Sequence, residues 1–117
     1  MKKRTVCSLG ALAVLAAVGC GASYPPPAQH LASSLAAVRT AQETGAASVP
    51  KAQLYLKLAE EETAQAKALM DDGENERADY MTLRAYNDAT LAMAIAKQNA
   101  ARVQVQQMNE GAARSPR

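Results

Sequence analysis

Residues 49–97, VPKAQLYLKLAEEETAQAKALMDDGENERADYMTLRAYNDATLAMAIAK, decide the fold, because two alanine-rich segments flank one short turn motif. The alanines recur every seven residues: Ala52, Ala59 and Ala66 in the first segment, and Ala78, Ala85 and Ala92, beside Ala89 and Ala96, in the second. A seven-residue apolar repeat on both segments predicts two helices that pack like a coiled coil. No run alternates between apolar and polar residues, so the sequence predicts no strands.

The turn motif DDGEN sets the direction and register of the two helices, expected at residues 50–71 and 75–109. A turn at Gly73 makes the pair antiparallel, so facing residues should have numbers that sum to about 146. This register places Glu62 opposite Arg84 and Lys57 near Asp88, two complementary pairs of charges at the edge of the seam. Ser48 and Asn75 have the side chains preferred at helix N-caps and are the expected caps.

A third helix is expected at residues 28–44, where Leu31, Leu35 and Val38 recur at helical spacing. Its expected docking surface consists of the large apolar residues that lie off the alanine stripes: Leu54, Leu58, Tyr80, Leu83 and Tyr86. The predicted fold is all-α, an antiparallel three-helix bundle or hairpin with a long C-terminal helix. The helical domain should occupy residues 28–110, with a disordered tail at 111–117.

The amino end, MKKRTVCSLGALAVLAAVGC, has a basic start followed by an apolar run at residues 6–18. A membrane-spanning helix needs about 20 apolar residues, so residues 1–19 are predicted to be a secretory signal peptide. The small residues before Cys20 resemble a bacterial lipobox. This resemblance implies cleavage between Gly19 and Cys20 and a lipid on the Cys20 thiol. The alternative is an ordinary signal cut nearby, which would leave Cys20 as a free thiol.

The cysteine count agrees with a lipid anchor. The chain has two cysteines, and Cys7 falls in the predicted signal peptide, so the mature chain cannot form an internal disulfide. Two or more acyl chains hold a protein firmly on a membrane. Residues 20–27 are then a lipidated tether stiffened by three consecutive prolines. Gly21 and Ala22 after the cysteine, by the same resemblance, imply the periplasmic face of the outer membrane.

Charge excludes a nucleic-acid partner for the mature chain. The 13 Lys and Arg residues fall to 10 when the signal peptide is removed, against 11 Asp and Glu, so the net charge changes from +2 to −1. The chain has no Phe or Trp and no basic stripe interleaved with aromatic residues.

The unequal helix lengths predict an overhang at residues 97–110, at the end of the bundle away from the Gly73 turn and the tether. At 1.5 Å per residue the third helix is about 50 Å long and the second about 30 Å. The overhang carries Val103, Val105 and Met108 and is expected either to fray or to dock a partner.

Other candidate sites have simpler explanations. Glu60, Glu61 and Glu62 point in different directions on a helix and should be solvated. His30 has no companion zinc ligand and should be a surface residue. A catalytic triad could be drawn from Ser33 or Ser34, His30 and Asp71, but no sequence motif orients these residues. DDGENE lacks the ligand spacing of a calcium loop. The four tyrosines, Tyr24, Tyr55, Tyr80 and Tyr86, could bind a peptide or glycan, but edge packing is the simpler expectation. We therefore expect no catalytic site, metal or cofactor.

The segments CGASYPPPAQHLASSLAAVRTAQETGA and the hairpin quoted above resemble a family of small alanine-rich helical lipoproteins of double-membrane bacteria, grouped as a domain of unknown function. In that family such domains lie beside, or are fused to, OmpA-like peptidoglycan-binding domains. The resemblance implies a structural or adaptor protein of the envelope, with an envelope protein or a peptidoglycan-associated protein as partner. The alternatives are a self-assembling lipoprotein and a periplasmic binder of glycans or small molecules.

Overall fold

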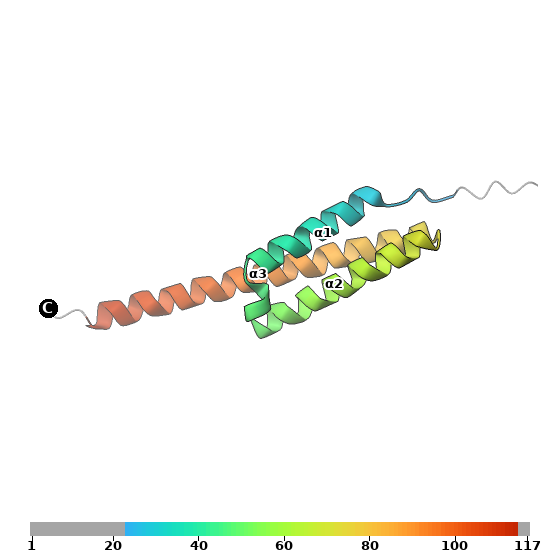
Figure 1. The fold of residues 1–117 in the computed structure, drawn as a ribbon. Helices are drawn as coiled ribbons and strands as arrows, with labels where there is room; N and C mark the ends of the chain where they lie inside the picture. The colour runs from blue at the N-terminus through green and yellow to red at the C-terminus, as the bar shows by residue number, and fades with distance from the viewer. Residues whose placement is uncertain (1–22, 115–117) are drawn as a thin grey trace, which may run out of the picture.

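The computed structural model describes residues 23–114 and confirms the all-α prediction for them. The elements are α1 (Ala28–Glu43), a short 3₁₀ turn η1 (Ala46–Ser48), α2 (Pro50–Asp71) and α3 (Asn75–Arg114). In Figure 1, α2 and α3 form an antiparallel hairpin, α1 lies along α3, and α3 continues well beyond both. The predicted signal peptide and Cys20 lie outside the described residues.

Two glycines make the turns between the helices. Gly45 and Gly73 have φ angles of 83° and 77°, in the left-handed region that favours glycine. At Gly73 the backbone closes with hydrogen bonds from Gly73 N to Met70 O, 3.1 Å, and from Glu74 N to Leu69 O, 2.8 Å. These bonds satisfy carbonyl groups at the end of α2, so the hairpin turn is tight.

Both predicted N-caps are wrong. Val49, not Ser48, occupies the cap position of α2, and no side chain caps this helix. Pro50 begins α2 instead, since its fixed φ suits the first helical position. Asn75 is the first residue of α3, and its side-chain amide donates to the carbonyl of Tyr24.

The predicted alanine stripes form the seam between α2 and α3. Seven of the alanines are completely buried, and Ala96 is 3% exposed; the seven are Ala52, Ala59, Ala66, Ala78, Ala85, Ala89 and Ala92. The largest side chains that are fully buried are those of Thr82 and Ser34. Each hydroxyl donates to a carbonyl of its own helix, at Asp79 and Leu31. These side chains are small, and their hydroxyls need no hydrogen-bond partner on another helix. The helices can therefore approach each other closely.

The Glu62–Arg84 pair confirms the predicted register, but the second expected pair of charges does not form. Arg84 Nη2 lies 2.7 Å from Glu62 Oε1. Lys57 and Asp88 form no such pair; Asp88 is instead a neighbour of Glu62. Burial raises the pKa of Glu62, Arg84 opposes this, and the negative charge of Asp88 adds to it. The buried carboxylate thus disfavours folding when charged, and Arg84 offsets part of that cost.

The prediction of how α1 docks is wrong. The five expected contact residues are all exposed: Leu54 57%, Leu58 36%, Tyr80 63%, Leu83 43% and Tyr86 45%. The side chains of α1 that become buried are Ser34, Val38 and Ala41. The closely spaced alanine seam leaves room only for small residues at the meeting of three helices, which keeps the larger ones outside.

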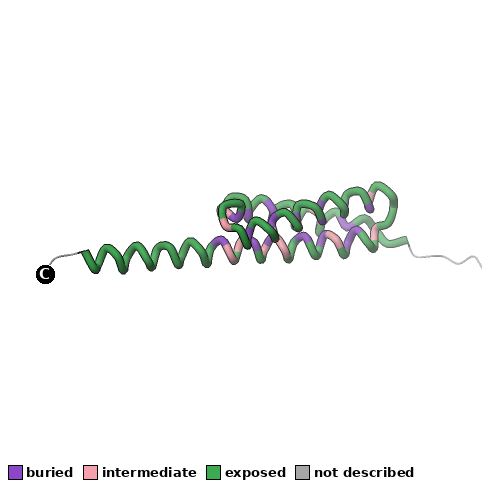
Figure 2. The backbone as a smooth tube through the Cα atoms, turned by 90° about the horizontal axis from the view of Figure 1, so that it is seen from below, coloured by how far each residue is buried: buried purple, intermediate pink, exposed green. Residues whose placement is uncertain are grey.

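The C-terminal part of α3, residues 97–114, stands clear of the bundle, and we call it the arm. Every residue of the arm is exposed (Figure 2). The predicted end of the helical domain at 110 and the disordered tail from 111 are wrong as far as residue 114, since the helix continues to Arg114. One glycine, Gly111, costs a helix only about 1 kcal/mol, and Ala112 and Ala113 favour it.

Candidate functional site

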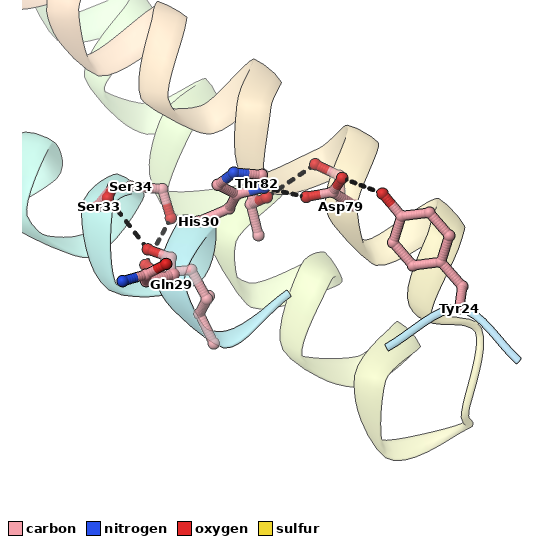
Figure 3. A network of polar contacts seen from close by, with 8 residues as sticks. Tyr24, Gln29, His30, Ser33, Ser34, Asp79 and Thr82 are labelled. Carbon is pink, nitrogen blue, oxygen red and sulfur yellow. Dashed lines mark hydrogen bonds and ion pairs between the residues drawn. The ribbon is translucent and has the colours of Figure 1, made fainter. Parts of the chain in front are cut away.

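Four side chains join the start of the described chain to the bundle, and we call them the stalk clamp: Tyr24, His30, Asn75 and Asp79. The hydroxyl of Tyr24 donates to Asp79 Oδ2 at 2.5 Å, and His30 Nδ1 contacts Asp79 Oδ1 (Figure 3). The amide of Asn75 donates to the Tyr24 carbonyl at 2.9 Å. The clamp therefore fixes the segment before α1, and α1 itself, to the beginning of α3.

Asp79 is the centre of the clamp and is charged at neutral pH. Its side chain is 12% exposed, whereas that of His30 is 54% exposed. Hydrogen bonds from His30, and next from Tyr24, hold the pKa of Asp79 below its ordinary value of 3.8. The same carboxylate raises the pKa of Tyr24 above 10.0, because the hydroxyl donates to a negative charge.

Asp79→Asn should lower stability at neutral pH, since one of the two accepting oxygens becomes an NH2 group that cannot accept a hydrogen bond, and the remaining oxygen carries no charge. A depressed folded pKa contributes stability above the unfolded value of 3.8, and this stability is lost as the pH falls through the folded pKa. Urea unfolding should thus separate the variant from the wild type at pH 7, and the two curves should converge below pH 3.8. Asp71→Asn, at an exposed carboxylate, is the matched control. Equal unfolding of Asp79→Asn and the wild type at pH 7 would contradict the clamp.

The structure does not bring together the serines, His30 and Asp71, a combination that the sequence did not favour. His30 pairs with Asp79 rather than with Asp71. The Ser33 hydroxyl donates to the carbonyl of Gln29, and that of Ser34 to the carbonyl of Leu31. Neither serine is hydrogen-bonded to His30, so His30 does not activate either hydroxyl as a nucleophile.

The structure assembles no metal site in residues 23–114, where no three His, Cys, Asp or Glu side chains gather. The three consecutive glutamates diverge as expected, and Glu60 accepts a hydrogen bond from Gln42. The expectation that all three are solvated is wrong for Glu62, which is buried because it faces α3 and pairs with Arg84. Of the tyrosines, Tyr24 belongs to the clamp and Tyr55 packs against the core.

The three residues predicted to bind a partner are exposed but do not share one face of the arm. Val103 is 41% exposed, Val105 50% and Met108 59%. Val103 follows Ala96 by seven residues and so continues the inner seam, whereas Val105 points away from it. Val105 lines a shallow hollow of about 370 Å³ with Gln98, Ala101, Arg102 and Gln106. The arm thus has two different candidate surfaces.

Among residues 23–114, no helix is both long and apolar enough to cross a bilayer. The family model "Domain of unknown function (DUF4398)" matches residues 29–108. The chain belongs to this family. The DUF4398 domain contains α1, α2 and α3 as far as Met108, so most of the arm is part of the domain. No curated protein and no solved structure matches the chain.

The DUF4398 domain also contains most of the stalk clamp. His30, Asn75 and Asp79 lie within the matched region, and Tyr24 precedes it by five residues. Sequence reasoning missed the clamp because His30 and Asp79 are 49 residues apart. The available signal was that Tyr24 and His30 flank the proline run. This part of the chain was expected to lie near the Gly73 turn.

Proposed function

We propose that this DUF4398 chain is a lipid-anchored helical lipoprotein, a structural or adaptor element on the periplasmic face of the outer membrane. Cys20 would carry the lipid, and the arm would reach towards the cell wall. The observation that carries the proposal is the stalk clamp, because it ties the segment leading to Cys20 to the Gly73 end of the bundle. The arm is at the opposite end (Figure 1).

Chain dimensions support this orientation. Tyr24 follows Cys20 by four residues, which span at most about 14 Å when fully extended. The Gly73 end of the bundle would therefore stay close to the membrane surface. The 40 residues of α3 rise about 60 Å, and the arm occupies the last 27 Å or so. A clamped rod of this shape would hold its arm at a fixed distance from the membrane.

The character of the polar groups favours a binding or structural role. The serine hydroxyls near His30 are bonded to their own helix, and Asp79 is bound by two partners from the clamp. The arm, in contrast, is exposed on every side. The resemblance to lipoproteins that accompany OmpA-like domains suggests an envelope protein bound to peptidoglycan as the partner.

The face of the arm that continues the inner seam is the proposed contact with this partner. Beyond Ala96 the seam positions become mainly polar, namely Asn99, Val103, Gln106 and Glu110, all exposed. Amide side chains both donate and accept hydrogen bonds, so this face suits a polar protein surface with one apolar contact at Val103.

A photo-crosslinking residue at Val103, in the full chain in intact cells, tests the adaptor role. We expect it to trap one envelope protein that mass spectrometry can identify. The matched control is a crosslinker at Ala64, which is exposed on α2 within the bundle. Absence of any adduct from Val103, or the same adducts from both positions, would contradict the proposal.

A further inference from the structure

α3 presents a second stripe of exposed residues on the side opposite the alanine seam; at Leu83 it borders α1, where Leu83 lines a shallow hollow with His30 and Ser33. It recurs every three or four residues from the bundle into the arm, and we call it the outer stripe: Tyr80, Leu83, Asn87, Leu91, Ala94, Gln98, Ala101, Val105, Met108 and Ala112. All ten residues are exposed, including Tyr80 at 63% and Met108 at 59%. Spacing of this kind is the pattern of a coiled-coil contact surface.

The outer stripe is uncharged along its whole length. Eight of the nine charged residues of α3 lie off it: Arg77, Asp79, Arg84, Asp88, Lys97, Arg102, Glu110 and Arg114. The ninth, Glu76, precedes Tyr80 by four residues and lies on the same face, just before the stripe begins. A neutral face gains no ion pairs from a charged partner, but it can meet an identical face without repulsion. The average spacing of about 3.6 residues is that of the α-helix itself, so the stripe runs nearly straight along α3 and can lie against another long helix.

The two polar members of the stripe favour self-recognition as well. Asn87 and Gln98 each carry an amide that is both donor and acceptor. Where two copies meet in register, each amide faces its own counterpart and the two can hydrogen-bond. A single polar residue of this kind fixes the register and number of helices in a coiled coil.

We propose that the outer stripe binds the same stripe of a second copy of this chain, with the two α3 helices parallel. The parallel direction rests on the proposed function, since two copies anchored in one membrane have their stalks at the same end. At the edge of such a pair, Lys97 lies beside Arg102 of the second copy. This like-charged contact weakens the dimer at low ionic strength, and salt screens it.

The matched pair Val105→Glu and Val103→Glu tests the surface, because the substitutions are identical but lie on different faces of the arm. Both are made in the full chain, with Cys7→Ser and Cys20→Ser, in mild detergent, and measured by sedimentation against concentration. We expect the parent chain and Val103→Glu to dimerise, and Val105→Glu to raise the dimer dissociation constant at least ~10-fold, about 1.4 kcal/mol. A parent chain that stays monomeric, or equal effects of the two variants, would overturn the proposal.

Single cysteines at two well-separated positions of the stripe test the direction. In the same background, Leu91→Cys and Ala112→Cys lie 21 residues, about 32 Å, apart. A parallel pair brings each cysteine to its own counterpart, so both variants should form disulfide dimers on mild oxidation, and Val103→Cys should not. Crosslinking of one variant alone, or of neither, would overturn the parallel arrangement. Because this background has no lipidated cysteine, failure here leaves the anchor at Cys20 to be judged separately.

Discussion

Leu56→Ala should lower the free energy of unfolding by about 2–5 kcal/mol, the usual cost of removing a buried leucine side chain. Leu56 is 4% exposed and is one of the few large side chains in a core made mainly of alanine. Alanine neighbours such as Ala59 and Ala89 cannot reach into the cavity that the substitution leaves. Since small domains have little stability to spare, the variant should unfold at a markedly lower urea concentration.

Leu54→Ala is the matched control for this prediction. Leu54 is on the same helix, two residues away, but is 57% exposed. Its substitution should change stability by a few tenths of a kcal/mol at most, as surface changes usually do. Urea unfolding followed by circular dichroism separates the two. Equal destabilisation by both variants would contradict the alanine seam and restore Leu54 as a contact for α1.

Cys20→Ser should abolish lipid attachment and remove the protein from the outer-membrane fraction. A thioether-linked lipid needs the sulfur of this residue, and serine offers no equivalent thiol. Each buried methylene contributes about 0.8 kcal/mol to membrane binding, so the loss of two or more acyl chains removes essentially all of the anchorage. Incorporation of labelled palmitate and fractionation of cells measure the two consequences.

Cys7→Ser controls for the loss of a thiol in general, since Cys7 lies in the predicted signal peptide. This variant should be lipidated and fractionate like the wild type. Persistence of the Cys20→Ser protein in the outer-membrane fraction would contradict the lipid anchor.

The hairpin could be predicted from the sequence because its signal is local and periodic. Alanine every seven residues defined the seam, and Gly73 set the antiparallel register that Glu62 and Arg84 confirm. The placement of α1 could not be predicted in the same way. Hydrophobicity favoured Leu54 and Tyr80 as its contacts, but the close approach of three helices selects small residues such as Ser34 and Ala41.

The candidate sites show the same division between local and long-range information. Val103, Val105 and Met108 were expected to form one partner-binding set, but helix geometry alone separates Val105 from Val103, so the sequence contained this information. The contact between His30 and Asp79 depends on how α1 lies on α3, which no spacing within either helix reveals. The helical state of residues 111–114 was missed because one glycine was given too much weight as a breaker.

The intact mass of the protein extracted from outer membranes tests the central proposal most directly. If this chain is a lipid-anchored rod, the mature polypeptide begins at Cys20 and carries the added mass of a diacylglyceryl group and an amide-linked acyl chain. A polypeptide that begins at another residue, or one whose Cys20 is an unmodified thiol, would contradict it.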